Sequence, residues 1–207
     1  MAKPALKKSL ELSNTIMINK KFLEQLKEDY KSNESERRQI ISASNSILFD
    51  SKKTIFALQR QDDKLGDKKL KELEKNLETL EKRFGAKRLN KEGAFRAATE
   101  EYVEAKVFAT IIKGKKIDAI KTLTLGYEAY LGGICDAVGE LVRYSTNQAA
   151  KGKFASVAKN KKIAEEIMSY LIDFDMTGYL RTKYDQARGH LRKLEQMAYE
   201  IKLKTRK

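Results

Sequence analysis

Two glutamates three residues apart, Glu101 and Glu104, are the side chains whose placement first suggests chemistry. In the segment 93–113 they stand in a row that helical spacing otherwise fills with apolar residues: Ala94, Ala97, Phe108 and Ile111. Because residues three apart share a helix face, the two carboxylates can converge. Acids in an inward row are costly unless a cation pairs with them. That cation could be a metal or a basic side chain of a neighbouring helix; the remaining interpretation is two surface glutamates.

A second acidic pair, Asp136 and Glu140, stands four residues apart and also shares one helix face. Three glycines leave little side-chain bulk in the same segment: Gly132, Gly133 and Gly139. Glycine inside a helix costs up to about 1 kcal/mol relative to alanine, so three of them suggest the close approach of another helix or of a ligand. The alternative is an ordinary helix–helix contact in which arginines neutralise the two acids.

If both pairs face one cavity, four carboxylates meet there. Two unit charges 4 Å apart repel by roughly 4 kcal/mol at an effective dielectric constant near 20. A bound divalent cation relieves this repulsion better than protonation does. Oxygen ligands select magnesium, with manganese as the alternative, over zinc. The sequence therefore predicts Glu101, Glu104, Asp136 and Glu140 as metal ligands.

The chain has one histidine, His190, and one cysteine, Cys135, which narrows the chemistry. A multi-histidine metal site and a ribonuclease with two histidines as acid and base are excluded within one chain. We expect His190, in a basic stretch, to face the surface or a nucleic acid, and Cys135, in an apolar run, to belong to the core. A lone cysteine fits a reducing cytosol. With no apolar stretch of transmembrane length, we expect a cytoplasmic protein without membrane contacts.

The charge balance suggests a polyanionic partner. The 207 residues contain 43 Lys and Arg against 29 Asp and Glu, a formal net charge of +14. Such a surplus is typical of proteins that bind nucleic acid or an anionic membrane surface, and a soluble Lys-rich surface is the alternative. Nine basic side chains are the candidates for phosphate contacts: Lys52, Lys53, Arg60, Lys87, Arg88, Arg96, Lys113, Lys115 and Lys116. For each of them, an ordinary solvated side chain is the competing interpretation.

Long helices must position these residues. Lys, Glu, Leu and Ala recur, and Pro4 is the only proline. Periodicity predicts helices over these stretches: 13–60, a leucine repeat from Leu70 that ends at Gly85, 93–113, 127–147, 162–174 and 179–204. A break is expected at 61–66, and no stretch alternates with a period of two. The expected fold is all-α, a single-domain bundle of about six or seven helices over residues 1–207.

Several segments resemble TRAX, the translin-associated protein, and with it the translin/TRAX family. Four segments carry the resemblance, together with the final helix to Lys204: 50–60, 101–105, 130–143 and 180–185. The segment 101–105 matches the acidic motif of TRAX, and 130–143 matches its later helix closely. Translin lacks the acidic pair at the positions that match Glu101 and Glu104, so the chain resembles TRAX more than translin.

The resemblance implies a translin-like helical fold, a closed homo-oligomer that is most often an octamer in the family, and binding of RNA, with single-stranded DNA as a second ligand. TRAX subunits cleave RNA with magnesium through acidic residues. Glu101 and Glu104 are thereby implied as catalytic. The family's further catalytic aspartate aligns with Asp173, which would also be a metal ligand, and Asp175 competes for that place.

The resulting hypothesis is a Mg²⁺-dependent endoribonuclease that binds and cleaves RNA within a helical oligomer. Its alternative is a non-catalytic protein of translin type that binds single-stranded RNA or DNA. The acidic pair argues against that alternative, because carboxylates repel phosphate unless a cation intervenes. A third hypothesis, a purely structural helical scaffold, is also compatible with the charge.

Overall fold

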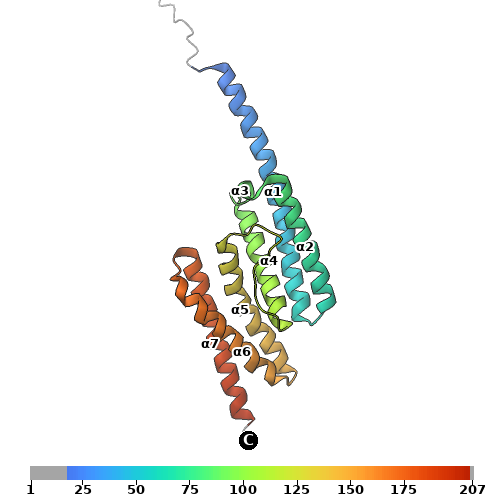
Figure 1. Ribbon diagram of the computed structural model, residues 1–207, viewed down its shortest axis with the longest axis vertical. Helices are drawn as coiled ribbons and strands as arrows, with labels where there is room; N and C mark the ends of the chain where they lie inside the picture. Colours follow the sequence, from blue (N-terminus) through green and yellow to red (C-terminus); the bar gives the residue numbers. More distant parts are fainter. Residues whose placement is uncertain (1–17, 206–207) are drawn as a thin grey trace, which may run out of the picture. The chain divides into compact units, whose positions relative to one another are not determined.

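The computed structural model describes residues 18–205, which contain seven α-helices, one 3-10 helix and no strand (Figure 1). The helices are α1 (Lys20–Gln59), α2 (Asp63–Phe84), α3 (Ala86–Leu89), α4 (Gly93–Ile112), α5 (Tyr127–Ala150), α6 (Phe154–Leu171), η1 (Ile172–Phe174) and α7 (Gly178–Lys204). The predicted all-α class is confirmed. The predicted start of the first helix, at Ser13, lies outside the described residues. None of the helices within 18–205 is long and apolar enough to cross a membrane.

The chain divides into two compact units at residue 38, and a single domain over residues 1–207 stays a prediction. The described part of the first unit, 18–38, is helical from Lys20 onward, and none of its side chains is buried. Phe22, Leu26 and Tyr30 are exposed there. The residues that could do chemistry all lie in the second unit.

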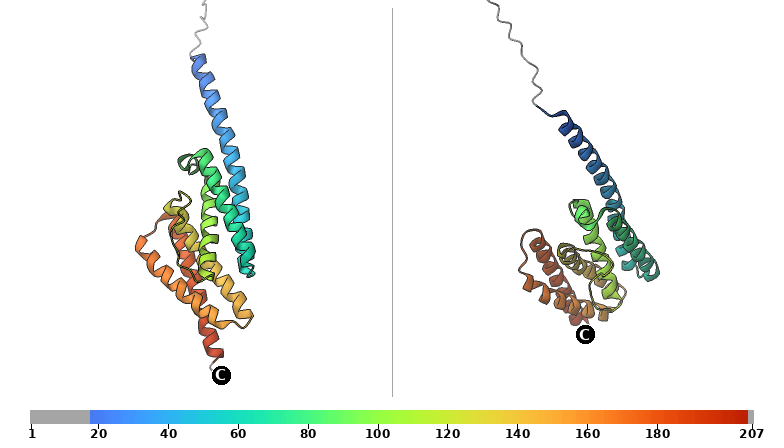
Figure 2. Two further views of the ribbon diagram at one scale, coloured as in Figure 1. Left: turned by 45° about the vertical axis from the view of Figure 1, so that its right-hand side comes forward. Right: turned by 45° about the horizontal axis from the view of Figure 1, so that its top comes forward.

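In the second unit, residues 39–205, α5 is the central helix. It packs against α4 on one side and against α6 and α7 on the other, and α4 also contacts α2 (Figures 1 and 2). The fully buried side chains Tyr102, Phe108, Leu141 and Leu194 come from α4, α5 and α7. The apolar row predicted for 93–113 faces the core only in its second half, since Phe108 and Ile111 are buried and Ala97 is exposed, and Cys135 is buried as predicted. The two acidic pairs are carried on the neighbouring helices α4 and α5.

Two helix boundaries differ from the prediction. The break after α1 is shorter than 61–66 because the Asp62 carboxylate caps α2, accepting a hydrogen bond from the Leu65 amide at 3.0 Å. Gly66 lies inside α2, buried against Leu58. Helix α6 begins at Phe154, earlier than the predicted residue 162, directly after a turn in which Gly152 has φ 74°. This start was not predicted because polar residues in the first turns of α6 interrupt the apolar periodicity there.

The connection from α6 to α7 is a tight turn. After η1, Asp175 adopts the left-handed conformation with φ 42°, and Gly178 has φ 55°. Aspartate is one of the few residues with a side chain that visits this region readily. The turn leaves Phe174 exposed beside the first residues of α7.

Helices α4 and α5 touch through their backbones at Gly133. A Cβ atom on Gly133 would lie 2.8 Å from the Glu100 carbonyl oxygen, 2.8 Å from the Glu104 amide nitrogen and 2.8 Å from Val103 Cβ. A Cβ on Gly132 would collide with the Glu100 carboxylate. The predicted close approach of a second helix is therefore present, and that helix is the one that carries the other acidic pair.

We predict that Gly133→Ala destabilises the protein. The added methyl group meets backbone atoms that cannot rotate away, so α4 and α5 must separate, and overpacking of this kind costs about 1–3 kcal/mol. Gly189→Ala in α7 is the matched control, since a Cβ there meets nothing within 4 Å. It should stabilise the protein by up to about 1 kcal/mol through helix propensity. Urea unfolding of both variants measures the difference, and equal effects would contradict the close contact.

Candidate active site

The α4–α5 contact brings four of the five predicted metal ligands together. Glu101 and Glu104 from α4 interact electrostatically with Asp136 and Glu140 from α5. Glu104 is the most buried of the four, with 8% of its surface exposed. These four residues are called the carboxylate cluster below. Within residues 18–205, the structure contains no group of three or more His, Cys, Asp or Glu side chains positioned to hold a metal ion.

Glu104 shows how unfavourable this concentration of acids is. Burial is the main cause that raises the pKa of Glu104 to about 9. The charges of Glu101, Asp136 and Glu140 also contribute to this rise. Burial also raises the pKa of Glu101, against the opposing effect of Lys52. At neutral pH, without an added cation, the Glu104 carboxyl therefore retains its proton.

A lysine that the sequence did not single out enters this region from α7. The Lys183 ammonium donates a hydrogen bond to Asp136 and forms an ion pair with Glu100 at 2.8 Å. The Tyr179 hydroxyl donates a second hydrogen bond to Glu100, at 2.6 Å. Burial alone would lower the pKa of Lys183, but its bonds to Asp136 and Glu100 outweigh this and raise it. The ammonium thus remains charged and neutralises part of the acidic region.

Glu140 is held by a different helix. The Gln59 side-chain amide of α1 donates to the Glu140 carboxylate at 2.6 Å and to its backbone carbonyl at 2.9 Å. Arg143, one turn along α5, lies 3.4 Å from the same carboxylate. Each of the two cluster acids on α5 is therefore held by a residue of another helix: Asp136 by Lys183 of α7 and Glu140 by Gln59 of α1.

The structure does not bring Asp173 to the carboxylate cluster. Asp173 is exposed on η1, and its competitor Asp175 lines a pocket that also includes Glu100. Among the aspartates of the described chain, Asp136 is the one that both pairs with Lys183 and raises the pKa of Glu104. The resemblance to TRAX pointed to Asp173, whereas helix packing places Asp136 near Glu104.

His190 faces α5 and is only partly exposed. Its Nε2 atom would lie 3.1 Å from a Cβ on Gly139, so this glycine makes room for the imidazole ring. Burial lowers the pKa of His190, and Lys193 lowers it further, although Asp136 and Glu140 act in the opposite direction. The ring is thus neutral at physiological pH and sits closer to the acids than a surface role would require.

The nine predicted phosphate contacts differ in exposure. Seven are exposed: Lys52, Lys53, Arg60, Lys87, Arg96, Lys115 and Lys116. The other two are partly covered and form ion pairs, Arg88 with Glu92 at 2.7 Å and Lys113 with Asp67. Lys52 also acts on the electrostatics of Glu101. The seven exposed side chains are accessible to phosphate, and among them Lys52 is close enough to the carboxylate cluster to act on Glu101.

Three site residues escaped the sequence analysis: Glu100, Lys183 and Gln59. Glu100 directly precedes Glu101 in the sequence, but it does not lie in the helical row that contains Glu101 and Glu104. Lys183 and Gln59 looked like ordinary polar helix residues, because their partners are 47 and 81 positions away in the sequence. No local periodicity can indicate contacts of that range.

We predict that Glu104→Gln removes a pH dependence of stability. A carboxyl with a pKa of about 9 in the folded protein and near 4.5 when unfolded makes the native state bind more protons between these values. Stability should therefore fall as the pH rises from about 4.5 to 9, by up to about 1.4 kcal/mol per unit. Glu104→Gln, which stays neutral, should flatten this fall and be more stable than the parent at pH 8.

The exposed Glu72→Gln in α2 is the control and should follow the parent. Urea unfolding over this pH range, without divalent cations, measures the effect. A slope shared by parent and Glu104→Gln would mean that Glu104 is ionised in the folded protein.

Comparison with known proteins agrees with this architecture. The model of the translin family matches residues 35–205. An uncharacterized protein of Methanocaldococcus jannaschii is 30% identical over 165 residues, which cover 77% of this chain and 73% of that protein.

Solved structures give the same result. The crystal structure of apo-NeC3PO superposes with a TM-score of 0.76 at 28% identity, over 86% of this chain and 95% of that chain. The structure of an AfC3PO–duplex RNA complex superposes with a TM-score of 0.75 at 26% identity, over 87% of this chain and 96% of that chain. The similarity therefore extends over the helices that carry the carboxylate cluster.

Proposed function

The chain belongs to the translin family, and we propose that it is a TRAX-like, Mg²⁺-dependent endoribonuclease that acts on RNA in a closed oligomer of this chain. The observation that carries the proposal is the buried Glu104 carboxyl. Its pKa of about 9 results from burial among three further carboxylates. A fold maintains such an unfavourable arrangement most readily where a cation and a chemical task go with it. Binding of duplex RNA by the similar AfC3PO supports RNA as the substrate.

The donor set fits magnesium. Glu101, Glu104, Asp136 and Glu140 offer oxygen atoms only, which suits Mg²⁺ and, as the alternative, Mn²⁺. When bound, the ion would supply positive charge for the pentacoordinate phosphate and an activated water. Asp136 takes the place of Asp173 as the third acid in this proposal, because Asp136 lies in the carboxylate cluster and Asp173 does not.

The chain's own residues have separate roles around that centre. Lys183 holds Asp136 and Glu100 in place and keeps positive charge next to the acids. Gln59 orients the Glu140 carboxylate. The exposed basic side chains bind the phosphates on either side of the cleaved bond. Glu104, which holds a proton on its carboxyl at neutral pH, would release it when a cation enters.

One observation favours the alternative of a non-catalytic protein that binds single-stranded RNA or DNA. Lys183 already neutralises Asp136 and Glu100, as the basic partner in a purely structural ion-pair network would do. In that case the acids stabilise the α4–α7 packing, and no metal is needed. RNA bound but left intact in Mg²⁺ and in Mn²⁺ would support this alternative.

We predict that Glu101→Ala/Glu104→Ala abolishes RNA cleavage and leaves RNA binding intact or slightly tighter, since removing acids lowers the repulsion of phosphate. Cleavage of labelled single- and double-stranded RNA is measured in Mg²⁺ and in EDTA, with thermal unfolding of the same preparations. Glu72→Ala/Glu195→Ala replaces the same number of glutamates at exposed positions and should cleave like the parent.

Two results would contradict the site. A folded Glu101→Ala/Glu104→Ala variant that cuts at the parental rate would remove these acids from the reaction. A variant whose activity falls only in step with its folded fraction would make the pair structural, because its basic partners would be left unpaired.

We also predict that RNA affinity depends steeply on salt. Each phosphate that a basic side chain neutralises on a single strand should add about 0.7 to the slope of log affinity against log salt concentration. Arg60→Ala, which removes one exposed predicted contact, should lower the slope by about that amount. Titrations of a labelled oligonucleotide in EDTA at several salt concentrations measure the slope. An affinity that does not change with salt would exclude an electrostatic RNA surface.

A further inference from the structure

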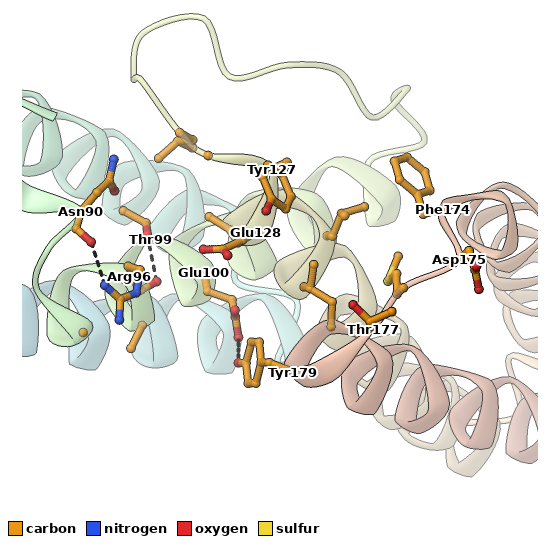
Figure 3. A pocket seen from close by; sticks show the side chains of 18 residues that line it. Asn90, Arg96, Thr99, Glu100, Tyr127, Glu128, Phe174, Asp175, Thr177 and Tyr179 are labelled. Carbon is orange, nitrogen blue, oxygen red and sulfur yellow. Dashed lines mark hydrogen bonds between the residues drawn. The ribbon is translucent and has the colours of Figure 1, made fainter. Parts of the chain in front are cut away.

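A cavity of about 1080 Å³ opens where α4, α5 and α7 begin. Three stretches of chain line it: 90–100, 125–131 and 174–180. Its volume is at the upper end of the range for small-molecule pockets, about 300–1,000 Å³. Figure 3 shows Tyr127 and Phe174 along one side of this pocket, and Tyr179 with Glu100 on the other. The pocket is large enough for a nucleotide.

Three exposed aromatic side chains line this pocket. Tyr127 is 70% exposed, Phe174 58% and Tyr179 59%, although each has an apolar ring. Local structure holds two of them in place. The left-handed Asp175 fixes the turn that presents Phe174, and the hydrogen bond to Glu100 fixes the Tyr179 ring. Exposed aromatic rings that line a pocket, as those of Tyr127 and Phe174 do, are the stacking platforms on which proteins bind unpaired bases.

The polar side chains of the pocket suit the uncharged base of a nucleotide better than its phosphate. Arg96 is the basic residue of the lining, and it donates to the Asn90 carbonyl at 2.7 Å. Three acids line the same pocket: Glu100, Glu128 and Asp175. Carboxylates repel a phosphate group, but they accept hydrogen bonds from the amino and imino groups of a base. The pocket therefore suits a base, while the phosphates lie outside it.

The pocket adjoins the proposed catalytic centre. Glu100 lines the pocket and pairs with Lys183 at 2.8 Å, and Lys183 in turn bonds to Asp136 of the carboxylate cluster. A nucleotide with its base in the pocket would thus have its phosphate next to Lys183 and the acids.

We propose that this pocket binds one unpaired base of the RNA strand, stacked on Tyr127 and Phe174, and so places the adjoining phosphate at the carboxylate cluster. This inference rests on the proposed function, because it assumes that RNA is the ligand. Beyond the proposed function, the inference states that the bound base is neither paired with another base nor stacked on the neighbouring bases of its strand.

The test compares two strands of equal length, a normal single-stranded RNA and a ribose-phosphate strand without bases. Affinities of the full chain are measured in EDTA, so that no strand is cut. Tyr127→Ala and Phe174→Ala should weaken binding of the normal strand by about 5- to 100-fold each, the effect of losing one stacked base. They should leave binding of the baseless strand unchanged. Tyr199→Ala, which removes an equally exposed tyrosine of α7 outside the pocket, should change neither affinity.

Three results would overturn the base pocket and leave the proposed function standing. One is an affinity for the normal strand that neither pocket variant changes. The others are an equal loss on both strands and a changed particle mass in light scattering, which would make the aromatic residues part of a subunit contact. A parent that binds neither strand would instead remove RNA as the ligand, and the proposed function would fail with the pocket.

Discussion

The backbone contact between α4 and α5 at Gly133 is the constraint on which the rest of this structure depends. A side chain at that position would separate the helices, since three atoms of α4 already lie 2.8 Å from where a Cβ would be. With glycine there, Glu101 and Glu104 face Asp136 and Glu140 across a narrow interface. Burial of the Glu104 carboxyl and, after it, repulsion from the other three carboxylates raise the pKa of Glu104, so that it keeps its proton.

The helices around this pair supply what the acids require. Lys183 of α7 reaches Asp136 and Glu100, and Gln59 of α1 reaches Glu140. Because the partners come from elements on opposite sides of α5, the acidic region can form only when α1, α4, α5 and α7 are all in place. The acids of the cluster therefore gain their partners only when these helices of the second unit have folded together. Two adjacent helices alone could not supply both partners.

The sequence predicted the helices and the four clustered acids because both leave local signals. Helical period identified α4 and α5, and Glu101 and Glu104 were visible as interruptions of an apolar row. Asp173 was placed by alignment alone, and the left-handed turn at Asp175 directs its segment toward a pocket on another side of Glu100. Lys183 could not be predicted, since its role depends on how α7 packs on α5, which side-chain spacing along one helix does not encode.

The distribution of charge explains how one protein could both bind RNA and cleave it. A net charge of +14 attracts phosphate over the whole surface, and most of the predicted basic contacts are exposed. Four of the acids that would weaken this attraction lie at the α4–α5 interface, where burial keeps Glu104 neutral until a cation arrives. Apo protein therefore presents RNA with less repulsion than four ionised carboxylates would cause. Entry of a divalent cation would replace the proton by a larger positive charge, so the acidic region becomes attractive to phosphate only when it is also ready for chemistry.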